Sequence, residues 1–361
     1  MPPVDDDPPG INGDAVRRYF AENVPGVLDP RELTFEVISG GRSNLTYRVS
    51  AETGSERWIL RRPPLAHVLP TAHDMSREYR VLATLQGSRV PVPTVVSLCE
   101  DAGVTGAPFY VMNYVDGVVL REPAQTAALT PAQRTSCADA LIDVLVELHG
   151  IDYHAVGLQN WGRPEGYLDR QVRRWLEQWE RSKTRELPLV DEIGRRLLAG
   201  LPPNSDGVIV HGDYRLDNTM LASDDPGRIV AVLDWEMSTL GDPLSDLALL
   251  LTYWTDPPGG GNGFTSAAVG RSLTALPGFP TRQEIAERYS SLSGRSIELV
   301  AYYLTLAYLK LAIILEGIHA RYLKGATVGT GFDNVGADVE SLVVASFEVA
   351  RNSGIPALAR R

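Results

Sequence analysis

The pattern of apolar and polar positions divides the chain into two parts. Between residues 30 and 120, short β-forming runs alternate with turn residues. LTFEVISGGRSNLTYRVSA predicts a hairpin, and RWILRR, VPVPTVVSLCED and APFYVMNYVDGVVL predict three further strands. HDMSREYRVLATL carries Tyr79, Leu82 and Leu85 at helical spacing behind Asp74 as a cap. We therefore expect a small, mostly antiparallel sheet with one helix.

Helical periodicity dominates the rest of the chain. TPAQRTSCADALIDVLVELHG predicts a helix with Thr130 as N-cap and Pro131 in its first turn. Further helices are expected at 166–183, 188–200, 243–254, 282–291, 298–323 and 338–353. The chain should thus form a loose tail (1–13), an N-lobe (14–116) that opens with a short helix, and a C-lobe (117–361). The glycine-rich run at 256–263 reads as a mobile loop.

Composition and charge narrow the class of protein. The 361 residues are 44% hydrophobic and 22% charged, as in ordinary globular proteins. A net charge of −11 argues against nucleic acid as a partner, because phosphate backbones demand clustered Lys and Arg. The two cysteines, Cys99 and Cys137, predict no disulfide framework. The acidic, Pro-rich start is unlike a signal peptide, so a cytoplasmic protein is expected.

One apolar stretch is nearly long enough to span a bilayer. LVAYYLTLAYLKLAIILEGI, residues 299–318, is interrupted by Lys310 and Glu316. The two charges favour a helix buried in the protein core, and no membrane partner is expected. The sequence does not indicate an oligomeric state.

Two polar clusters follow apolar runs that we expect to be buried strands of one hairpin. VIVHGDYRLDN contains Asp213 and Asn218, and IVAVLDWE contains Asp234. Two carboxylates and an amide oxygen suit Mg²⁺, which prefers oxygen ligands. In such a site one Asp is left free of the metal to orient a hydroxyl nucleophile. This arrangement serves phosphoryl transfer, where positioning and charge neutralisation provide most of the catalysis.

HGDYRLDN followed by LDWE resembles the catalytic and metal-binding pair of the aminoglycoside phosphotransferase and choline kinase superfamily. The resemblance implies a bilobal, protein-kinase-like α+β fold, with a small antiparallel-sheet N-lobe and a larger, mainly helical C-lobe. It also implies an N-lobe that binds nucleotide and a C-lobe that carries catalysis and binds the acceptor. The implied cofactors are ATP and Mg²⁺, and the implied partner is a small molecule with a hydroxyl group.

The resemblance assigns roles to residues of both polar clusters. Asp213 matches the catalytic Asp that accepts or orients the hydroxyl proton, and Arg215 lies where many kinases have a Lys that steadies the phosphate. Asn218 and Asp234 match the metal ligands. His211 is expected to hold the catalytic loop through hydrogen bonds rather than to act chemically.

The segment after Asp234 departs from protein kinases. Trp235 and Glu236 replace Phe-Gly, which makes an activation-loop switch unexpected. Two roles stay open for Glu236: contact with a metal-bound water, or a cap on the next turn. In GDPLSDLA, Asp246 matches the residue that ties down the catalytic loop's backbone, and Asp242 suits a helix N-cap.

The N-lobe supplies the implied nucleotide elements. SGGRSN, residues 39–44, lies where kinases have a phosphate-covering loop whose glycines let backbone N–H groups approach the phosphates. Gly-Gly is also common in ordinary hairpin turns, so the motif alone is weak. The loop residues assigned to the nucleotide are Gly40, Gly41, Arg42, Ser43 and Asn44.

Two further N-lobe elements match by position. Arg61 stands where kinases have the strand-three Lys, with Glu78 as its expected ion-pair partner; the alternative is a pair of surface charges. In FYVMNYVDG, Met112 matches the gatekeeper of the hinge, Asn113 offers its C=O and Val115 its N–H to adenine. A plain buried strand is compatible with the same residues.

The acceptor is less defined. LRRPP, HDMSREYRVL and the segment from HGDYRLDN to LDWEMSTLGDPLSDLA look most like a subgroup associated with acyl-CoA dehydrogenases, which implies a hydroxyacyl-CoA acceptor. Arg170, Arg173 and Arg174 fall on one helical face that suits an anionic CoA, next to Trp175 and Trp179. The alternative is a solvated basic face over a Trp-filled core.

Other functions stay open at this point. An aminoglycoside, choline or sugar would serve equally as hydroxyl acceptor, and ATP cannot be told from GTP. A non-catalytic nucleotide- or CoA-binding protein is suggested only by Arg61, which stands in place of the usual Lys. A metallohydrolase site of His211, Asp213 and Asp234 would need further ligands, and the other histidines lack ligand spacing.

Overall fold

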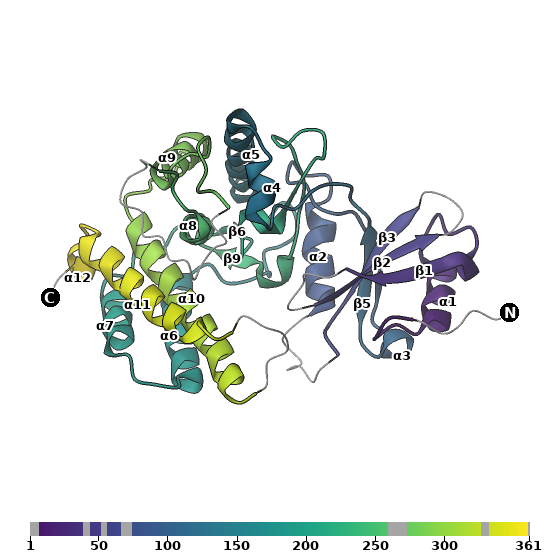
Figure 1. Ribbon diagram of the computed structural model, residues 1–361, viewed down its shortest axis with the longest axis horizontal. Coiled ribbons are helices and arrows are strands. Elements are labelled where there is room, and N and C mark those ends of the chain that lie inside the picture. Colours follow the sequence, from purple (N-terminus) through teal and green to yellow (C-terminus); the bar gives the residue numbers. More distant parts are fainter. Residues whose placement is uncertain are drawn as a thin grey trace. The chain divides into compact units, whose positions relative to one another are not determined.

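The computed structural model describes residues 7–38, 44–51, 56–65, 74–258, 273–325 and 332–359. The chain forms two compact units (Figure 1). The first unit comprises Met1–Gly117 and Val230–Glu236, and the second comprises Val118–Ile229 and Met237–Arg361. The first unit therefore contains a short segment, 230–236, that lies in the sequence between the two parts of the second unit.

The first unit is built on a five-stranded antiparallel sheet in the order β1-β2-β3-β5-β4. Pairing of β1 with β2 runs from Leu33 opposite Ala51 to Val37 opposite Tyr47, as the hairpin prediction requires. The strands are β1 (Leu33–Val37), β2 (Leu45–Ala51), β3 (Arg57–Arg62), β4 (Val95–Cys99) and β5 (Phe109–Asn113).

Alternation along these strands gives the sheet two different faces. Val49, Trp58 and Leu60 pack with Phe20 of α1 (Gly13–Asn23) in one buried cluster. Side chains at intervening positions point to the other face, where α2 (Met75–Leu85) packs against β4 and β5. Asp74 caps α2 by accepting a hydrogen bond from the N–H of Arg77, as expected. A short helix that the sequence did not predict, α3 (Ala102–Thr105), contacts α1.

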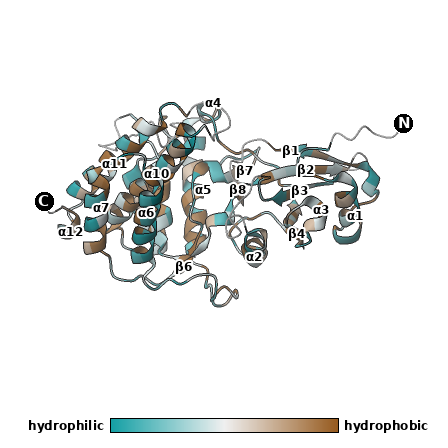
Figure 2. Ribbon diagram, turned by 90° about the horizontal axis from the view of Figure 1, so that it is seen from below, coloured by the Kyte–Doolittle hydropathy of each residue, from teal (hydrophilic) through white to brown (hydrophobic). Residues whose placement is uncertain are grey.

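The second unit is mainly helical. The predicted helices are present with ends that differ by at most three residues, and α5 (Pro131–His149) begins at the expected Thr130 and Pro131. Its other long helices are α6 (Tyr167–Ser182), α7 (Pro188–Ala199), α8 (Pro243–Tyr253), α9 (Arg282–Ser293), α10 (Val300–Leu323) and α11 (Val335–Asn352). Two short helices were not predicted, α4 (Pro123–Ala127) and α12 (Pro356–Ala359). Figure 2 shows hydrophilic and hydrophobic turns on α6, whose Leu168, Val172 and Trp179 are buried.

The strand pairing around the polar clusters differs from our expectation. The strand before Asp213, β6 (Val208–Val210), pairs with β9 (Thr239–Gly241), and not with β8 (Ile229–Val232) before Asp234. The chain instead turns from β7 (Thr219–Leu221) into β8, and Ala222 donates its N–H to the carbonyl of Arg228 at 2.8 Å. The prediction of one hairpin was wrong because a short strand that the sequence analysis did not predict, β7, lies between the two clusters and pairs with β8.

The apolar helix α10 lies in the core of the second unit. By length and composition it is apolar enough to cross a membrane, yet 61% of its most apolar 18-residue window is buried inside the protein. It packs against α6, α7, α8 and α11. Its Glu316 is fully buried and accepts hydrogen bonds from the N–H and hydroxyl of Thr184, both at 2.7 Å. The burial of the helix and the hydrogen bonds of Glu316 agree with the predicted core helix.

Candidate active site

The loop after β6 carries the first polar cluster in the second unit. Val208, Ile209 and Val210 are buried, so the strand anchors the loop in the core. Gly212 has φ of 84°, and a Cβ added there would lie 2.6 Å from the carbonyl oxygen of Met237. The loop can follow this path only with glycine at this position.

Asp246 of α8 holds this loop by its backbone. One carboxylate oxygen accepts the N–H of His211 at 2.6 Å, and the other accepts the N–H of Gly212 at 2.8 Å. His149 contacts the same carboxylate at 3.3 Å and Tyr289 at 2.8 Å. Burial acts to raise the pKa of Asp246, but the hydrogen bond and charge of His149 outweigh it, and the pKa lies below its usual value. The supporting role predicted for Asp246 is present in the structure.

Asp242 and His211 also act as supports. Asp242 caps α8 by accepting the N–H of Leu244 at 3.0 Å, and it accepts hydrogen bonds from Ser205 and Tyr303 at 2.6 and 2.8 Å. The Nδ1 of His211 lies 3.2 Å from the backbone N of Asp213 and accepts its hydrogen. His211 is fully buried, as expected of a residue that holds the loop.

Asp213 and Asn218 are brought together by a short 3₁₀ turn at Leu216–Asn218. The side-chain Nδ2 of Asn218 donates to the backbone carbonyl of Asp213 at 2.9 Å and to its carboxylate at 2.8 Å. These bonds fix the carboxylate of Asp213. Because the Nδ2 of Asn218 is engaged, Oδ1 is the atom of this amide that is suited to a cation.

Arg215 lies between two carboxylates. Its Nε is 3.4 Å from the carboxylate of Asp213, and its Nη1 is 3.1 Å from that of Asp217. The guanidinium also covers the ring of Tyr253, 4.7 Å from the ring centroid. No role was predicted for Asp217 or Tyr253, because their contacts with Arg215 depend on folding that no local pattern reveals.

In the first unit, Arg61 of β3 bridges two acidic residues. Its Nε is 3.1 Å from the carboxylate of Glu78 on α2, so the expected ion pair is present. Its Nη2 donates to the carboxylate of Asp234. Burial acts to lower the pKa of Arg61, but Glu78 and Asp234 outweigh it and raise the pKa. Glu78 is 2% exposed, and burial raises its pKa despite the nearby Arg61.

Asp234 has an unusual backbone conformation. Its φ of 67° is the one positive value found at a non-glycine residue in the part of the chain that the structure describes. Asp tolerates this region better than most residues, at a cost on the order of 1 kcal/mol. The next residue, Trp235, is buried and donates its indole N–H to the carbonyl of Val232 at 3.0 Å. A strained backbone at an acidic residue, next to a buried and hydrogen-bonded Trp, is typical of a functional position.

Asn44 and Glu236 lie in the same unit and contact each other. The Nδ2 of Asn44 donates to Glu236 at 3.1 Å. Asn44 is 4% exposed, and its buried Oδ1 has no hydrogen-bond partner. Glu236 lies inside a 3₁₀ turn at Trp235–Met237, and its two open roles stay predictions. The other four residues of the predicted phosphate loop, Gly40, Gly41, Arg42 and Ser43, lie outside the described residues.

The predicted hinge residues lie at the end of β5. Met112 is buried, and Asn113 is exposed and donates its N–H to the carbonyl of Thr94 at 2.8 Å. Val115 follows two residues after the strand ends. These positions are compatible with both interpretations, a nucleotide hinge and a plain buried strand.

The basic face predicted on α6 is largely engaged within the fold. Arg170 donates to the carbonyls of Arg163 and Glu165, and Arg173 pairs with Asp169 at 3.0 Å. Arg174 is exposed. The prediction of three arginines that together face a ligand is therefore wrong for Arg170, because its guanidinium closes the loop that precedes the helix.

The two tryptophans of α6 have different environments. Trp179 is 2% exposed and belongs to the core, whereas Trp175 is half-buried. The core reading therefore applies to Trp179.

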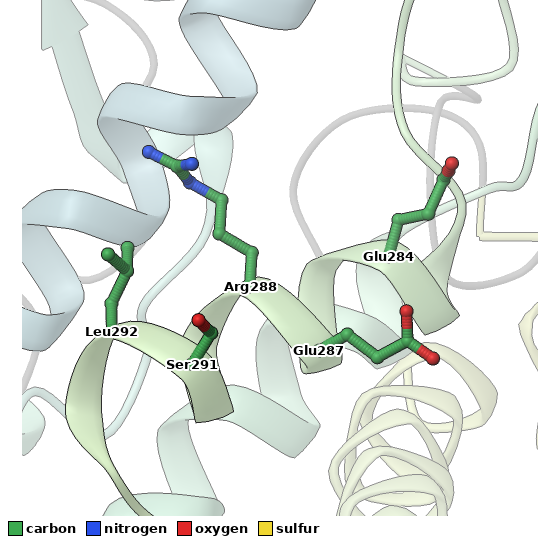
Figure 3. Close-up of a pocket in the computed structure, with 5 residues that line it drawn as sticks. All are labelled: Glu284, Glu287, Arg288, Ser291 and Leu292. Carbon is green, nitrogen blue, oxygen red and sulfur yellow. The ribbon is translucent and has the colours of Figure 1, made fainter.

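A shallow pocket lies elsewhere in the second unit. It is lined by residues of α9 alone, and none of them is a predicted site residue (Figure 3). Arg288 points from α9 toward α5, where it pairs with Asp143 at 2.7 Å and Asp139 at 3.2 Å. The lining residues are Glu284, Glu287, Arg288, Ser291 and Leu292.

Two of the open functions, the metallohydrolase and the kinase, need different sets of metal ligands. Among the residues the structure describes, no group of three or more His, Cys, Asp or Glu side chains is arranged to hold a metal ion. A metallohydrolase site needs such a cluster. A kinase magnesium site does not, since Mg²⁺ keeps several waters and binds substrate phosphates besides one or two protein oxygens.

Comparison with known proteins defines the class. The model of the phosphotransferase enzyme family matches residues 34–284. Acyl-CoA dehydrogenase family member 10 of Mus musculus is 32% identical over 347 residues, which are 95% of this chain and 32% of that protein. The chain thus spans about a third of the length of this curated relative.

Solved structures agree with the family match. A Ralstonia eutropha protein described as a candidate aminoglycoside phosphotransferase has a TM-score of 0.79 at 32% identity, over 94% of this chain and 98% of that one. A ternary complex of APH(2″)-IIa with streptomycin and ATP has a TM-score of 0.55 at 15% identity, over 88% and 91% of the two chains, and shows likeness of fold.

The chain belongs to the phosphotransferase enzyme family. This membership supports phosphotransferase activity on a hydroxyl acceptor, and the predicted protein-kinase-like α+β fold is confirmed. The resemblance to the aminoglycoside phosphotransferase and choline kinase superfamily is confirmed as well. The non-catalytic reading that Arg61 suggested loses its support.

Proposed function

We propose that the chain is an ATP- and Mg²⁺-dependent kinase that transfers the γ-phosphate to the hydroxyl of a small molecule, with Asp213 as the catalytic residue. The observation that carries this proposal is the geometry of the catalytic loop. The Nδ2 of Asn218 donates to the carboxylate of Asp213 at 2.8 Å. The carboxylate of Asp246 accepts the backbone N–H groups of the two residues before Asp213, at 2.6 and 2.8 Å. A carboxylate fixed in this way is ready to orient a hydroxyl without reorganisation.

Each residue of the loop has a defined part in this proposal. Asp213 accepts or orients the proton of the acceptor hydroxyl, and Arg215 steadies the transferring phosphoryl group. The Oδ1 of Asn218 and the carboxylate of Asp234 are the proposed magnesium ligands, and both are the hard oxygen donors that this cation prefers. When bound, Mg²⁺ neutralises charge on the phosphates.

The first unit supplies the proposed nucleotide contacts. Arg61 pairs with the α- and β-phosphates while Glu78 keeps it in place, since an Arg fork suits phosphate oxygens. Met112, Asn113 and Val115 are the proposed hinge contacts to adenine. The loop at 39–44 is the proposed cover over the phosphates.

We propose a hydroxyacyl-CoA as acceptor. This choice is supported by the relative named as an acyl-CoA dehydrogenase family member, whose similarity spans 95% of this chain. Aminoglycosides, choline and sugars are the competing acceptors. The proposal places the protein in the cytoplasm, where ATP and acyl-CoA are available.

The function is tested by an ADP-release screen with ATP and Mg²⁺ over hydroxyacyl-CoAs, aminoglycosides, choline and sugars. We expect release with a hydroxyacyl-CoA and none from Asp213→Ala. Asp224→Ala is the matched control, because Asp224 is an exposed residue of the same unit that pairs with Arg228. A strong response to an aminoglycoside without any response to acyl-CoAs would overturn the acceptor assignment.

A further inference from the structure

Lys310 is an unusual cation in this chain. Of 34 basic residues only three are lysines, at positions 183, 310 and 324. Lys310 lies within the apolar core helix α10, whereas Lys324 is exposed at the end of that helix. The helix packs on four others, and a charge buried in its middle costs free energy unless it has a polar or charged partner.

The ammonium of Lys310 lies beside the catalytic loop. Its Nζ donates to the carbonyl of Gly212 at 3.2 Å, one residue before Asp213. It also lies 5.6 Å from the ring centroid of Trp175 on α6. Burial lowers the pKa of Lys310, and the charges of Asp213 and Asp246 oppose that change.

The contacts of Lys310 leave part of its hydrogen-bonding capacity unused. An ammonium has three N–H donors. One donates to Gly212, and a cation over an aromatic ring gains attraction but no acceptor oxygen. In the ranges that the structure describes, the other donors meet no protein acceptor, and the side chain is partly exposed. A half-buried ammonium with spare donors points to a ligand oxygen.

We propose that Lys310 is a specificity-determining residue of the acceptor site, where its ammonium donates to a carbonyl or carboxylate oxygen close to the reacting hydroxyl. This inference rests on the proposed function, in which Asp213 orients that hydroxyl. A hydroxyacyl thioester carries such an oxygen, and the ring of Trp175 offers an apolar face to its acyl chain.

The same ammonium selects against cationic acceptors. Two cations, Lys310 and Arg215, lie near Asp213, within hydrogen-bond or ion-pair reach of its loop. A polycationic aminoglycoside or a choline headgroup would meet like charge there, which is repulsive at short range. Lys310 therefore favours a neutral or anionic acceptor.

The test compares binding by calorimetry, without ATP, for the full chain and three variants. The probes are 3-hydroxybutyryl-CoA and kanamycin. Lys310→Met should weaken binding of 3-hydroxybutyryl-CoA by about 10- to 100-fold, the range for a hydrogen bond from a charged donor. Lys310→Gln keeps a neutral donor and should weaken it less, and Lys324→Met should not change it. Thermal unfolding of each variant checks that it is folded.

The outcomes separate this inference from the proposed function. Equal affinity of the unaltered chain and Lys310→Met, no binding of 3-hydroxybutyryl-CoA at all, or tighter binding of kanamycin would overturn the role of Lys310. Binding that depends on Lys310 without any ADP release on adding ATP and Mg²⁺ would support this role and contradict the kinase. ADP release with an acceptor KM that is unchanged in Lys310→Met would support the kinase and contradict the role of Lys310.

Discussion

The two aspartates predicted at the site, Asp234 in the first unit and Asp213 in the second, are held in different ways. Asp234 has a left-handed backbone and forms an ion pair with Arg61, which also pairs with buried Glu78. Asp213 is held by the neutral amide of Asn218, on a loop that is fixed through its backbone. The carboxylate of Asp213 combines this hydrogen bond with an ion pair to Arg215, whereas that of Asp234 is held by the ion pair with Arg61.

This difference indicates which of the two aspartates we expect to exchange partners when ligands bind. A cation that binds the carboxylate of Asp234 meets the positive charge of Arg61, which already pairs with one of its oxygens. The phosphates of a nucleotide offer Arg61 an alternative partner. The hydrogen bonds around Asp213 need no such exchange. We therefore expect the first unit's cluster to rearrange and the second unit's loop to stay as it is.

The largest expected effect comes from Asp213→Asn. Loss of the base that orients the hydroxyl should lower kcat by about 10²- to 10⁴-fold. Nucleotide affinity should be kept, because the proposed nucleotide contacts lie in the first unit. Steady-state kinetics and nucleotide titration measure both quantities, with Asp224→Asn as the exposed control. A kcat within tenfold of the unaltered chain would remove Asp213 from the mechanism.

Asp246→Ala tests the preformed loop. The N–H groups of His211 and Gly212 and the ring of His149 lose their acceptor, which should cost about 3 kcal/mol or more of unfolding free energy. Urea unfolding measures this loss. Asp246→Asn keeps one acceptor oxygen and should cost less.

The loss of unfolding free energy in Asp246→Ala should depend on pH. The folded pKa of Asp246 lies below its usual 3.8, so its contribution to stability is present above that value and is lost as the pH falls through the folded pKa. The deficit of the variant should therefore shrink in strong acid. A deficit independent of pH would show that the carboxylate charge is not what holds the loop.

Arg61→Ala tests the ion pair of the first unit. Removal of the cation leaves Glu78 buried and unpaired, which should cost about 3 kcal/mol near neutral pH. The pKa of Glu78 is already raised above 4.5 by burial and should rise further without Arg61. A group with a raised folded pKa stabilises the protein below its unfolded pKa and loses that contribution as the pH rises through the folded pKa.

The deficit of Arg61→Ala should therefore be small below about pH 4.5 and should grow as the pH rises. Denaturant unfolding across a pH series measures it, and Arg61→Lys is the control that keeps the charge. A deficit that is the same in acid and at neutral pH would mean that Arg61 stabilises the unit by packing alone.

The smallest expected effect is that of Asp217→Asn. Asp217 shares Arg215 with Asp213, so its loss should draw Arg215 closer to the catalytic carboxylate. We expect kcat to fall by less than about tenfold, as for a partly screened ion pair. A fall as large as that of Asp213→Asn would give Asp217 a direct part in the chemistry.

Local signals explain what the sequence predicted well. The caps at Thr130 and Asp74, and the helical spacing that follows each, are encoded within a few residues, so the helices begin where expected. The roles of Asp246 and His211 were implied by the resemblance to the family, and the hydrogen bonds of both residues agree with them.

Contacts between distant residues explain what the sequence missed. Pairing of β6 with β9 depends on a path through β7 and β8 that short apolar runs do not specify. The sequence showed Lys310 only as a charge that interrupts an apolar helix, almost a hundred residues after the loop it contacts. Side-chain partners at such separations follow from the fold and not from spacing.

The most direct test of the central claim is mass spectrometry of 3-hydroxybutyryl-CoA after incubation with the chain, ATP and Mg²⁺. We expect a product that carries one added phosphoryl group on the acyl hydroxyl, and no such product with Asp213→Asn. ATP hydrolysis without a phosphorylated acceptor, or the same product from Asp213→Asn, would contradict it.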